Sequence, residues 1–269
     1  MDDLLIATSP VPAPSGEPGR FSLDVHEGWL QGRGAYGGLV LGAMTRAMEA
    51  CEPEKERVLR SLTGEIAGPV TSGRADVRVT VVRRGSGVTV LRAELGHGDD
   101  VLAVATAVLG KTRKVEHRWF PPPPAAALAG WRDVPVAPIG PPLAPQFAQY
   151  LEFRLTGPVP FSSAPSPHAE GWIRTRKPLP SLGAPEIVAL ADAYYPAAFS
   201  IESAPRPIST IAFTLQYFPP EIPLDPTEPL FHRAHAIAAH EGFLAETREL
   251  WTADGRLVSL NPQTFVWIR

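Results

Sequence analysis

One run of apolar residues limits the possible folds of this chain more than any other feature. Residues 39–48 read Leu-Val-Leu-Gly-Ala-Met-Thr-Arg-Ala-Met, which as a helix is apolar on almost every side and must be covered on every side. Strands follow it, because 75–83 alternates apolar with polar residues and 88–95 and 101–109 are further strand-like segments bounded by turns. We therefore expect a strongly curved antiparallel sheet wrapped around a central helix, which is an α+β fold.

The second half of the chain repeats this order of elements. Residues Pro185–Phe199 predict a helix, and the strands predicted after it span 208–218, 231–238, 243–251 and 257–268. A constant shift of 155 residues brings Arg78 onto Arg233 and Glu94 onto Glu249. Few identities support this shift, so the shared order of helix, strand and turn is the better evidence for an internal duplication.

A proline-rich segment separates the two halves. Many of the 31 prolines lie between residues 119 and 145, and such a stretch should form an extended, polyproline-like connector without helix or central strand. We therefore predict an N-terminal domain at 1–118, a linker at 119–147 and a C-terminal domain at 148–269.

Composition excludes several classes of function. The net charge of −3 gives no basic field for a nucleic-acid backbone, and the single cysteine, Cys51, has no partner for a disulfide or a metal knuckle. The N-terminus is acidic where a secretory signal is basic, and no stretch approaches the roughly 18 apolar residues that span a bilayer. We expect a cytoplasmic protein that binds neither nucleic acid nor membrane.

One glycine pattern matches the dinucleotide-binding fingerprint, Gly32-x-Gly34-x-x-Gly37, and it precedes a helix. That fold needs a parallel sheet with alternating strands and helices, whereas hairpins without a further helix fill this chain up to residue 110. Two other interpretations stay open. The glycine amides at the helix start hold a carbonyl or phosphate oxygen, or the glycines let helix and sheet pack closely.

The histidines do not predict a metal site. On a strand, His232 and His235 point to opposite faces, and no carboxylate stands at a supporting spacing near them or near His240. We interpret all three as surface or interface residues. The nucleophile motif Gly-x-Ser-x-Gly is absent, and Cys51 lies in a charged loop, so we predict neither a metal, a cofactor nor a covalent nucleophile.

Three polar residues of the second half stand out. Asp192 interrupts an apolar helical run, and a partly desolvated carboxylate is a candidate general base. Thr210 opens a predicted strand, and Gln263 interrupts the last one. Each has a plain structural alternative: a helix side facing solvent, a β-branched strand residue, and a bulge residue on an edge strand. Together they supply a carboxylate, a hydroxyl and an amide able to hold one water.

Four segments resemble the acyl-CoA thioesterase II family. Residues Tyr36–Gly42 are similar to its "FGGQVVGQ" segment, 191–196 to "SDYNFLP", 209–212 to "ATID" and 257–263 to "LVASTVQ". The segments are loosely similar, but they occur in the family's order and spacing over nearly the whole chain outside the linker. The chain departs from the pattern at Tyr36, Leu39, Ala212 and Phe218, where the family has Phe, Gln, Asp and His.

The resemblance implies a double hotdog, two curved antiparallel sheets each wrapped around a helix, that hydrolyses acyl-CoA to free acid and CoA in fatty acid metabolism. It implies catalytic roles for Asp192, Thr210 and Gln263, which correspond to the family's Asp, Thr and Gln. The residues expected to contact substrate are Tyr36, Gly37, Gly38, Tyr194, Tyr195 and Phe213. A homodimer or homotetramer is also expected.

In the mechanism we expect, Asp192 accepts the proton of a water that Thr210 and Gln263 direct at the thioester. A backbone amide near a helix start, or the Gln263 amide, stabilises the developing oxyanion. Two other functions remain: a non-catalytic acyl-CoA-binding hotdog protein, and a hotdog enoyl-CoA hydratase. The hydratase needs a His paired with its Asp, and no His lies near Asp192 in the sequence.

Overall fold

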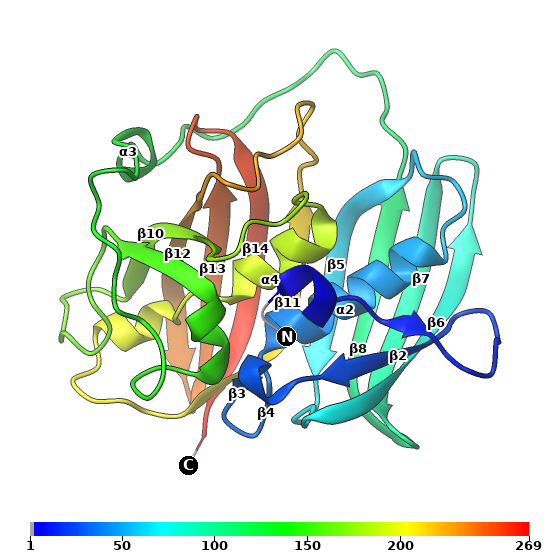
Figure 1. Ribbon diagram of the computed structural model, residues 1–269. Coiled ribbons are helices and arrows are strands. Elements are labelled where there is room, and N and C mark those ends of the chain that lie inside the picture. The colour runs from blue at the N-terminus through cyan, green and yellow to red at the C-terminus, as the bar shows by residue number, and fades with distance from the viewer. Residues whose placement is uncertain (1–2, 269) are drawn as a thin grey trace.

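The computed structural model describes residues 3–268, and one antiparallel sheet of twelve strands dominates it. This sheet curves around two helices, α2 (Gly37–Ala50) and α4 (Ala184–Asp192), which pack against one another on its concave side (Figure 1). In sheet order the strands are β1 (Val11–Pro12), β2 (Arg20–Val25), β6 (Gly73–Arg84), β7 (Val88–His97), β8 (Asp100–Gly110), β5 (Val58–Ile66), β11 (Ile208–Tyr217), β14 (Leu257–Trp267), β13 (Phe243–Trp251), β12 (Leu230–His240), β10 (His168–Thr175) and β9 (Leu151–Leu155). The short elements are α1 (Leu4–Ala7), η1 (Glu27–Trp29), β3 (Leu30–Gln31), β4 (Gly34–Ala35), α3 (Ala125–Leu128), η2 (Gln146–Tyr150) and η3 (Ala197–Ser200).

The order of the strands shows the predicted duplication. Outwards from the centre, β5-β8-β7-β6-β2-β1 on one side are matched by β11-β14-β13-β12-β10-β9 on the other, and each innermost strand follows a central helix. Arg78 pairs with Glu94 across β6 and β7, and Arg233 pairs with Glu249 across β12 and β13. The shift of 155 residues between the halves is therefore also the shift between equivalent pairs of strand residues.

The twelve strand pairings recorded within residues 3–268 are all antiparallel. A dinucleotide-binding fold requires parallel strands on both sides of its glycine-rich turn. The fingerprint at Gly32, Gly34 and Gly37 is therefore coincidental, and the expected hairpins surround α2 instead.

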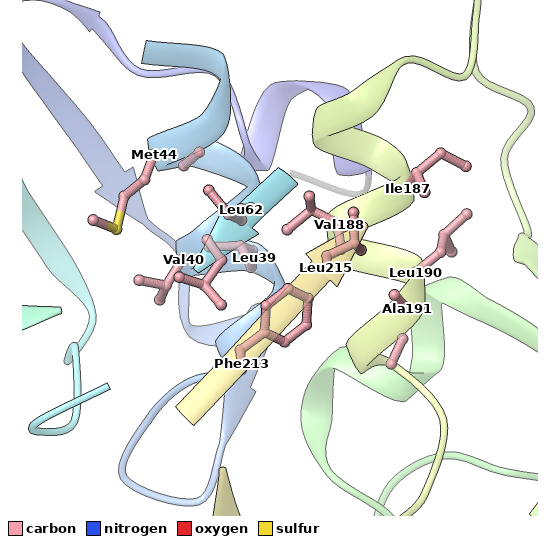
Figure 2. Close-up of a cluster of buried hydrophobic side chains, with 14 of the residues drawn as sticks. Leu39, Val40, Met44, Leu62, Ile187, Val188, Leu190, Ala191, Phe213 and Leu215 are labelled. Atoms are coloured by element: carbon pink, nitrogen blue, oxygen red, sulfur yellow. The ribbon is translucent and has the colours of Figure 1, made fainter. Parts of the chain in front are cut away.

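Two glycines let the central helices touch. A Cβ on Gly38 would lie 2.6 Å from the Ala189 carbonyl oxygen, and one on Gly42 would lie 2.8 Å from the Pro185 carbonyl oxygen. Apolar side chains from both helices and from β5 and β11 fill the remaining space (Figure 2). The labelled side chains are Leu39, Val40, Met44, Leu62, Ile187, Val188, Leu190, Ala191, Phe213 and Leu215. No helix within the described residues is long and apolar enough to cross a membrane.

The second central helix is shorter than predicted. The sequence predicts helix from Pro185 to Phe199, but α4 ends at Asp192, and residues 197–200 form the separate turn η3. Pro196 explains the difference, because a proline cannot donate to the carbonyl four residues before it and its ring clashes with the preceding turn. The functional consequence is that Asp192 stands at a helix end and not inside a helix.

The sequence interpretation missed β5, β9 and β10. β5 is the most important of the three, because it pairs with β11 and joins the two halves into one sheet. Its alternation is broken by a register shift between Leu59 and Ser61. Leu59 and Leu62 are therefore both buried although they are three residues apart, which hides the strand pattern.

The proline-rich segment is not extended throughout. It contains the four-residue helix α3, contrary to the prediction that no helix forms there. Ala127 of α3 is buried in a cluster with three aromatic residues and one leucine of the C-terminal half of the sheet, and this burial favours the short helix. The cluster consists of Trp172, Phe231, Trp251 and Leu257. The exact domain boundaries at 118 and 148 stay a prediction.

Candidate active site

The Asp192 carboxylate is held at the junction of the two central helices. Its side chain is only 5% exposed. Oδ2 accepts a 2.7 Å hydrogen bond from the Gly38 backbone N–H in the first turn of α2, and Oδ1 accepts one of 3.0 Å from the Gln263 side-chain amide. The carboxylate is thus positioned by α2 and by β14.

Thr210 and Gln263 join Asp192 in one hydrogen-bonded chain. Thr210 Oγ1 donates to Gln263 Oε1 over 3.2 Å, and Gln263 Nε2 in turn donates to Asp192. Thr210 lies opposite Phe265, and Phe213 lies opposite Gln263, with a bulge between Thr210 and Ala212. Because the bulge adds one residue, Thr210 faces the same side as Phe213 although the two are three apart.

Gln263 lies at the centre of the sheet. The edge-strand interpretation of this residue is wrong, because β14 pairs with β11 on one side and β13 on the other. Gln263 Nε2 also donates to Asn261 Oδ1 at 2.7 Å, and Asn261 Nδ2 donates to the Thr214 carbonyl on β11 at 2.6 Å. The register places Pro262 opposite Thr214, so the Asn261 amide supplies a donor where the proline has none.

A buried ion pair lies beneath the site. Arg248 on β13 is 1% exposed and donates from Nε to Glu246 Oε1 at 2.8 Å. Its Nη1 donates to the carbonyl oxygens of Ala191, Asp192 and Tyr194 at 3.2–3.3 Å, which satisfies the end of α4. Burial raises the pKa of Glu246, and Arg248 opposes that rise.

The sequence interpretation missed Glu246, Arg248 and Asn261. Leu244 and Leu250 are the core-facing leucines of β13, and every second residue between them shares their side. That alternation was a usable signal, since it places Glu246 and Arg248, which carry opposite charges, on the buried face.

An apolar cavity of about 710 Å³ opens beside the carboxylate. Its polar lining near the hydrogen-bonded chain consists of Asp192, Thr210 and Arg248. Phe265 and residues 193–196 also line it. The linker lines it with Ala137, Pro138, Ile139, Gly140, Leu143, Ala144, Pro145 and Phe147. Its volume is typical of pockets for small molecules.

The residues expected to contact substrate divide into two groups. Tyr194 and Tyr195 line the cavity, whereas Tyr36 and Phe213 are not part of its wall. Tyr36 is buried and stacks on Phe147 with ring centroids 4.2 Å apart, and burial together with the Asp192 charge raises its pKa. Phe213 packs between the helices (Figure 2).

Gly37 and Gly38 also lie outside the cavity wall, and both stand against Asp192. A Cβ on Gly37 would lie 2.9 Å from Asp192 Oδ2. Of the two interpretations of these glycines, the structure supports close packing, here of helix on helix, and it gives the Gly38 amide a carboxylate as partner. Direct contact of either glycine with substrate stays a prediction.

His232 is a core residue, and the prediction of a surface position for it is wrong. It is fully buried between Leu230 and Ala234 on the inward face of β12, and its ring stacks on Tyr194 with centroids 4.5 Å apart. Burial and the Arg248 charge lower its pKa well below the ordinary value. His235 points outward, as the alternation predicts.

The described residues contain no group of three or more His, Cys, Asp or Glu side chains able to hold a metal ion. What the site offers is a carboxylate and a hydroxyl at the wall of an apolar cavity, joined by hydrogen bonds through the Gln263 amide, which is buried and does not line the cavity. Such a set can orient one water and accept its proton.

Family models match both halves of the chain. One, described as the acyl-CoA thioesterase N-terminal domain, matches residues 25–110, and one described as the acyl-CoA thioesterase C-terminal domain matches residues 121–267. In a comparison with curated proteins, no sequence matches the chain.

Solved structures are similar over the whole length. A conserved protein of unknown function with a hot dog fold from Alicyclobacillus acidocaldarius has a TM-score of 0.81 and 23% identity, covering 99% of this chain and 98% of that one. The tesB protein of Mycobacterium avium subs. paratuberculosis has a TM-score of 0.78 and 15% identity, covering 99% of each chain. An acyl-CoA thioesterase II, TesB2, from Mycobacterium marinum has a TM-score of 0.68 and 15% identity, covering 98% and 96%. The fold is a double hotdog.

Proposed function

Because this chain belongs to the acyl-CoA thioesterase family, we propose that it hydrolyses acyl-CoA to a carboxylic acid and CoA with a water activated by the set Asp192, Thr210 and Gln263. The observation that carries this proposal is the hydrogen-bonded chain from Thr210 through Gln263 to Asp192, of which Thr210 and Asp192 line the cavity. The three residue types implied by the family resemblance converge there from β11, β14 and α4.

The chemistry needs a positioned water and a base. Asp192 accepts a proton from the water as its oxygen bonds to the thioester carbon, and the Thr210 hydroxyl oxygen fixes the direction of attack. Gln263 holds these two groups in place through its hydrogen bonds to both. Collapse of the tetrahedral intermediate breaks the carbon–sulfur bond and releases CoA, whose thiolate takes the proton that Asp192 had accepted, which restores the carboxylate. Neither a metal nor a covalent intermediate is needed for these steps to balance.

The apolar cavity suits the acyl group. Its lining is mostly aliphatic and aromatic, with contributions from the linker and from Tyr194, Tyr195 and Phe199. Burial of a hydrocarbon chain there is favourable by about 0.8 kcal/mol for each CH₂ group. The thioester of a chain seated in this cavity lies next to Asp192, at the cavity's polar end.

Release of CoA thiol from octanoyl-CoA tests the proposal. Asp192→Asn removes the base, and we expect kcat to fall by about 10²–10⁴-fold. Asp24→Asn removes an exposed carboxylate on β2 and should leave kcat unchanged. Undiminished turnover in Asp192→Asn would remove this carboxylate from the mechanism.

The two other functions give different readouts. A non-catalytic binder is stabilised against thermal unfolding by CoA esters yet releases no thiol, and a hydratase removes enoyl absorbance from an enoyl-CoA without thiol release. His232 does not support the hydratase, because its ring packs on Tyr194 and neither of its nitrogens makes a hydrogen bond to any described residue. A cytoplasmic location, a role in fatty acid metabolism and a homo-oligomeric state stay predictions.

A further inference from the structure

The site lacks a free donor at the two places where one was expected for the oxyanion. At the helix start, the Gly38 N–H is already bonded to Asp192 Oδ2, and Gly37 does not line the cavity. The two hydrogens of the Gln263 amide go to Asp192 Oδ1 and Asn261 Oδ1. Negative charge developing on the thioester oxygen therefore needs another donor at the cavity wall.

Arg248 has such a donor. A guanidinium carries five N–H groups on three nitrogens. Nε is bonded to Glu246, and Nη1 is bonded to the carbonyl oxygens at the end of α4. Nη2 makes no hydrogen bond to any residue from 3 to 268, although the side chain is only 1% exposed and lines the cavity.

The position of Arg248 relative to the base also fits this role. Its Nη1 lies 3.9 Å from Asp192 Oδ1, so the guanidinium and the carboxylate are direct neighbours. When Asp192 takes the proton of the water, one negative charge leaves the carboxylate and appears on the oxygen of the tetrahedral intermediate. A cation beside both positions stabilises the charge before and after the transfer.

The packing around Arg248 keeps its direction fixed. Glu246 is fully buried, and its second oxygen accepts from the Ala197 backbone N–H at 2.8 Å. The guanidinium also lies over the Phe265 ring, 5.2 Å from the ring centroid. A donor held this way needs no reorganisation when the substrate arrives, which is the property that makes such donors effective.

We propose that Arg248 is a further catalytic residue, whose free Nη2 donates to the thioester carbonyl oxygen and to the oxyanion formed from it. This assignment rests on the proposed thioesterase function and deepens it. Arg248 contacts the reacting oxygen directly, and it also holds the helix end that carries Asp192. The experiment must separate these two roles.

A pair of matched ligands separates them. Octanoyl-CoA has the carbonyl oxygen, and its thioether analogue S-octyl-CoA has the same chain without it. In the Asp192→Asn background, which slows turnover, we expect octanoyl-CoA to bind about tenfold more tightly than S-octyl-CoA, as for a hydrogen bond to a charged group. Adding Arg248→Met should remove this preference and leave the affinity for S-octyl-CoA within about threefold of its starting value. If Arg248→Met lowered the affinity for both ligands equally, Arg248 would have a purely structural role and the proposal would be overturned.

A second substitution guards against misfolding. Arg248→Lys keeps a cation opposite Glu246, but its ammonium reaches only as far as the guanidinium carbon. We expect kcat for octanoyl-CoA to fall about 100-fold with little change in KM, because the lost donor acts mainly in the transition state. Arg233→Lys is the matched control, since Arg233 is paired with Glu249 on the neighbouring strand outside the cavity, and it should retain wild-type kcat.

The outcomes also separate this proposal from the proposed function. An active wild-type enzyme with undiminished kcat in Arg248→Lys would overturn the role of Arg248 alone. A wild-type protein that releases no thiol from octanoyl-CoA or any other acyl-CoA overturns the thioesterase function. The ligand preference of the Asp192→Asn protein would still report whether Arg248 binds the carbonyl.

Discussion

The Gly38 backbone N–H donates a 2.7 Å hydrogen bond to Asp192 Oδ2, across 154 positions of sequence. This bond joins the first turn of α2 to the last residue of α4. The two halves of the duplication therefore meet at the proposed base, and the position of that base depends on how closely the two helices approach.

A methyl group at position 38 should force the helices apart. Its Cβ would lie 2.6 Å from the Ala189 carbonyl oxygen and 2.8 Å from Asp192 Cβ, and neither atom is the flexible end of a side chain. We expect Gly38→Ala to lower the free energy of unfolding by about 1–3 kcal/mol. We also expect kcat to fall about tenfold or more, because a small displacement of a catalytic group is costly. Urea unfolding and thiol release measure the two effects.

The control for this substitution is Gly85→Ala, at a hairpin turn where the nearest atom to the new Cβ is 3.5 Å away. It should leave both quantities unchanged. A Gly38→Ala protein with wild-type stability and kcat would show that the close approach of the helices is not required.

The hydroxyl of Thr210 should contribute to catalysis through Gln263. We expect Thr210→Val to lower kcat about 10–100-fold and Thr210→Ser to stay within a few fold of wild type, because only the valine removes the donor to Gln263 Oε1. The effects of substituting groups that act as a unit are not additive. The kcat of the double variant Thr210→Val with Gln263→Leu should therefore be little lower than that of Gln263→Leu alone. If the fold-losses of kcat in the two single variants multiplied in the double variant, the two residues would act independently.

Asn261 should support Gln263 and the sheet at the same time. Asn261→Ala leaves the Thr214 carbonyl without its donor and Gln263 without one of its acceptors. We expect about 1–3 kcal/mol less stability and about tenfold lower kcat. Ser259→Ala on the same strand removes a buried hydroxyl that has no hydrogen-bond partner among the described residues, and it should change neither value. Wild-type kcat in Asn261→Ala would show that Gln263 is held without it.

The regular parts of the fold could be predicted because their residues either alternate or form long apolar runs. The strand β6 alternates apolar and polar residues, and α2 and β8 contain unbroken apolar runs. β5 could not, because its bulge places Leu59 and Leu62 on one face. The end of α4 could have been placed better, since Pro196 forbids the hydrogen bond that would extend the helix past Asp192.

The members of the candidate site could be named from the sequence, but their arrangement could not. Asp192, Thr210 and Gln263 stand out as polar residues in apolar segments, yet the bulge that turns Thr210 towards Gln263 leaves no mark in the residue pattern. Arg248 was missed because its charge suggests the surface, although the leucines of β13 indicate an inward face. The linker wall of the cavity depends on long-range packing, which periodicity does not report.

Glu49 should make the stability of the protein depend on pH. It stands near the end of α2, and burial raises its pKa from 4.5 to about 7, with a further rise from Glu186 and opposing effects of Arg46 and Lys55. A carboxyl group with a raised pKa keeps its proton in the folded state while the unfolded chain loses it. Its stabilising contribution is complete below pH 4.5, falls as the pH rises and is lost above about pH 7.

Replacement by glutamine tests this dependence. Glu49→Gln is uncharged at every pH, so we expect it to exceed the wild type in free energy of unfolding by about 1–3 kcal/mol at pH 8 and to match it near pH 4.5. Glu56→Gln makes the same change of charge at a side chain that is 84% exposed and should show no such pH-dependent difference. Urea denaturation at both pH values measures the effect. Parallel stability curves for Glu49→Gln and the wild type would mean that Glu49 does not titrate between them, and a difference equal to that of Glu56→Gln would assign the effect to net charge.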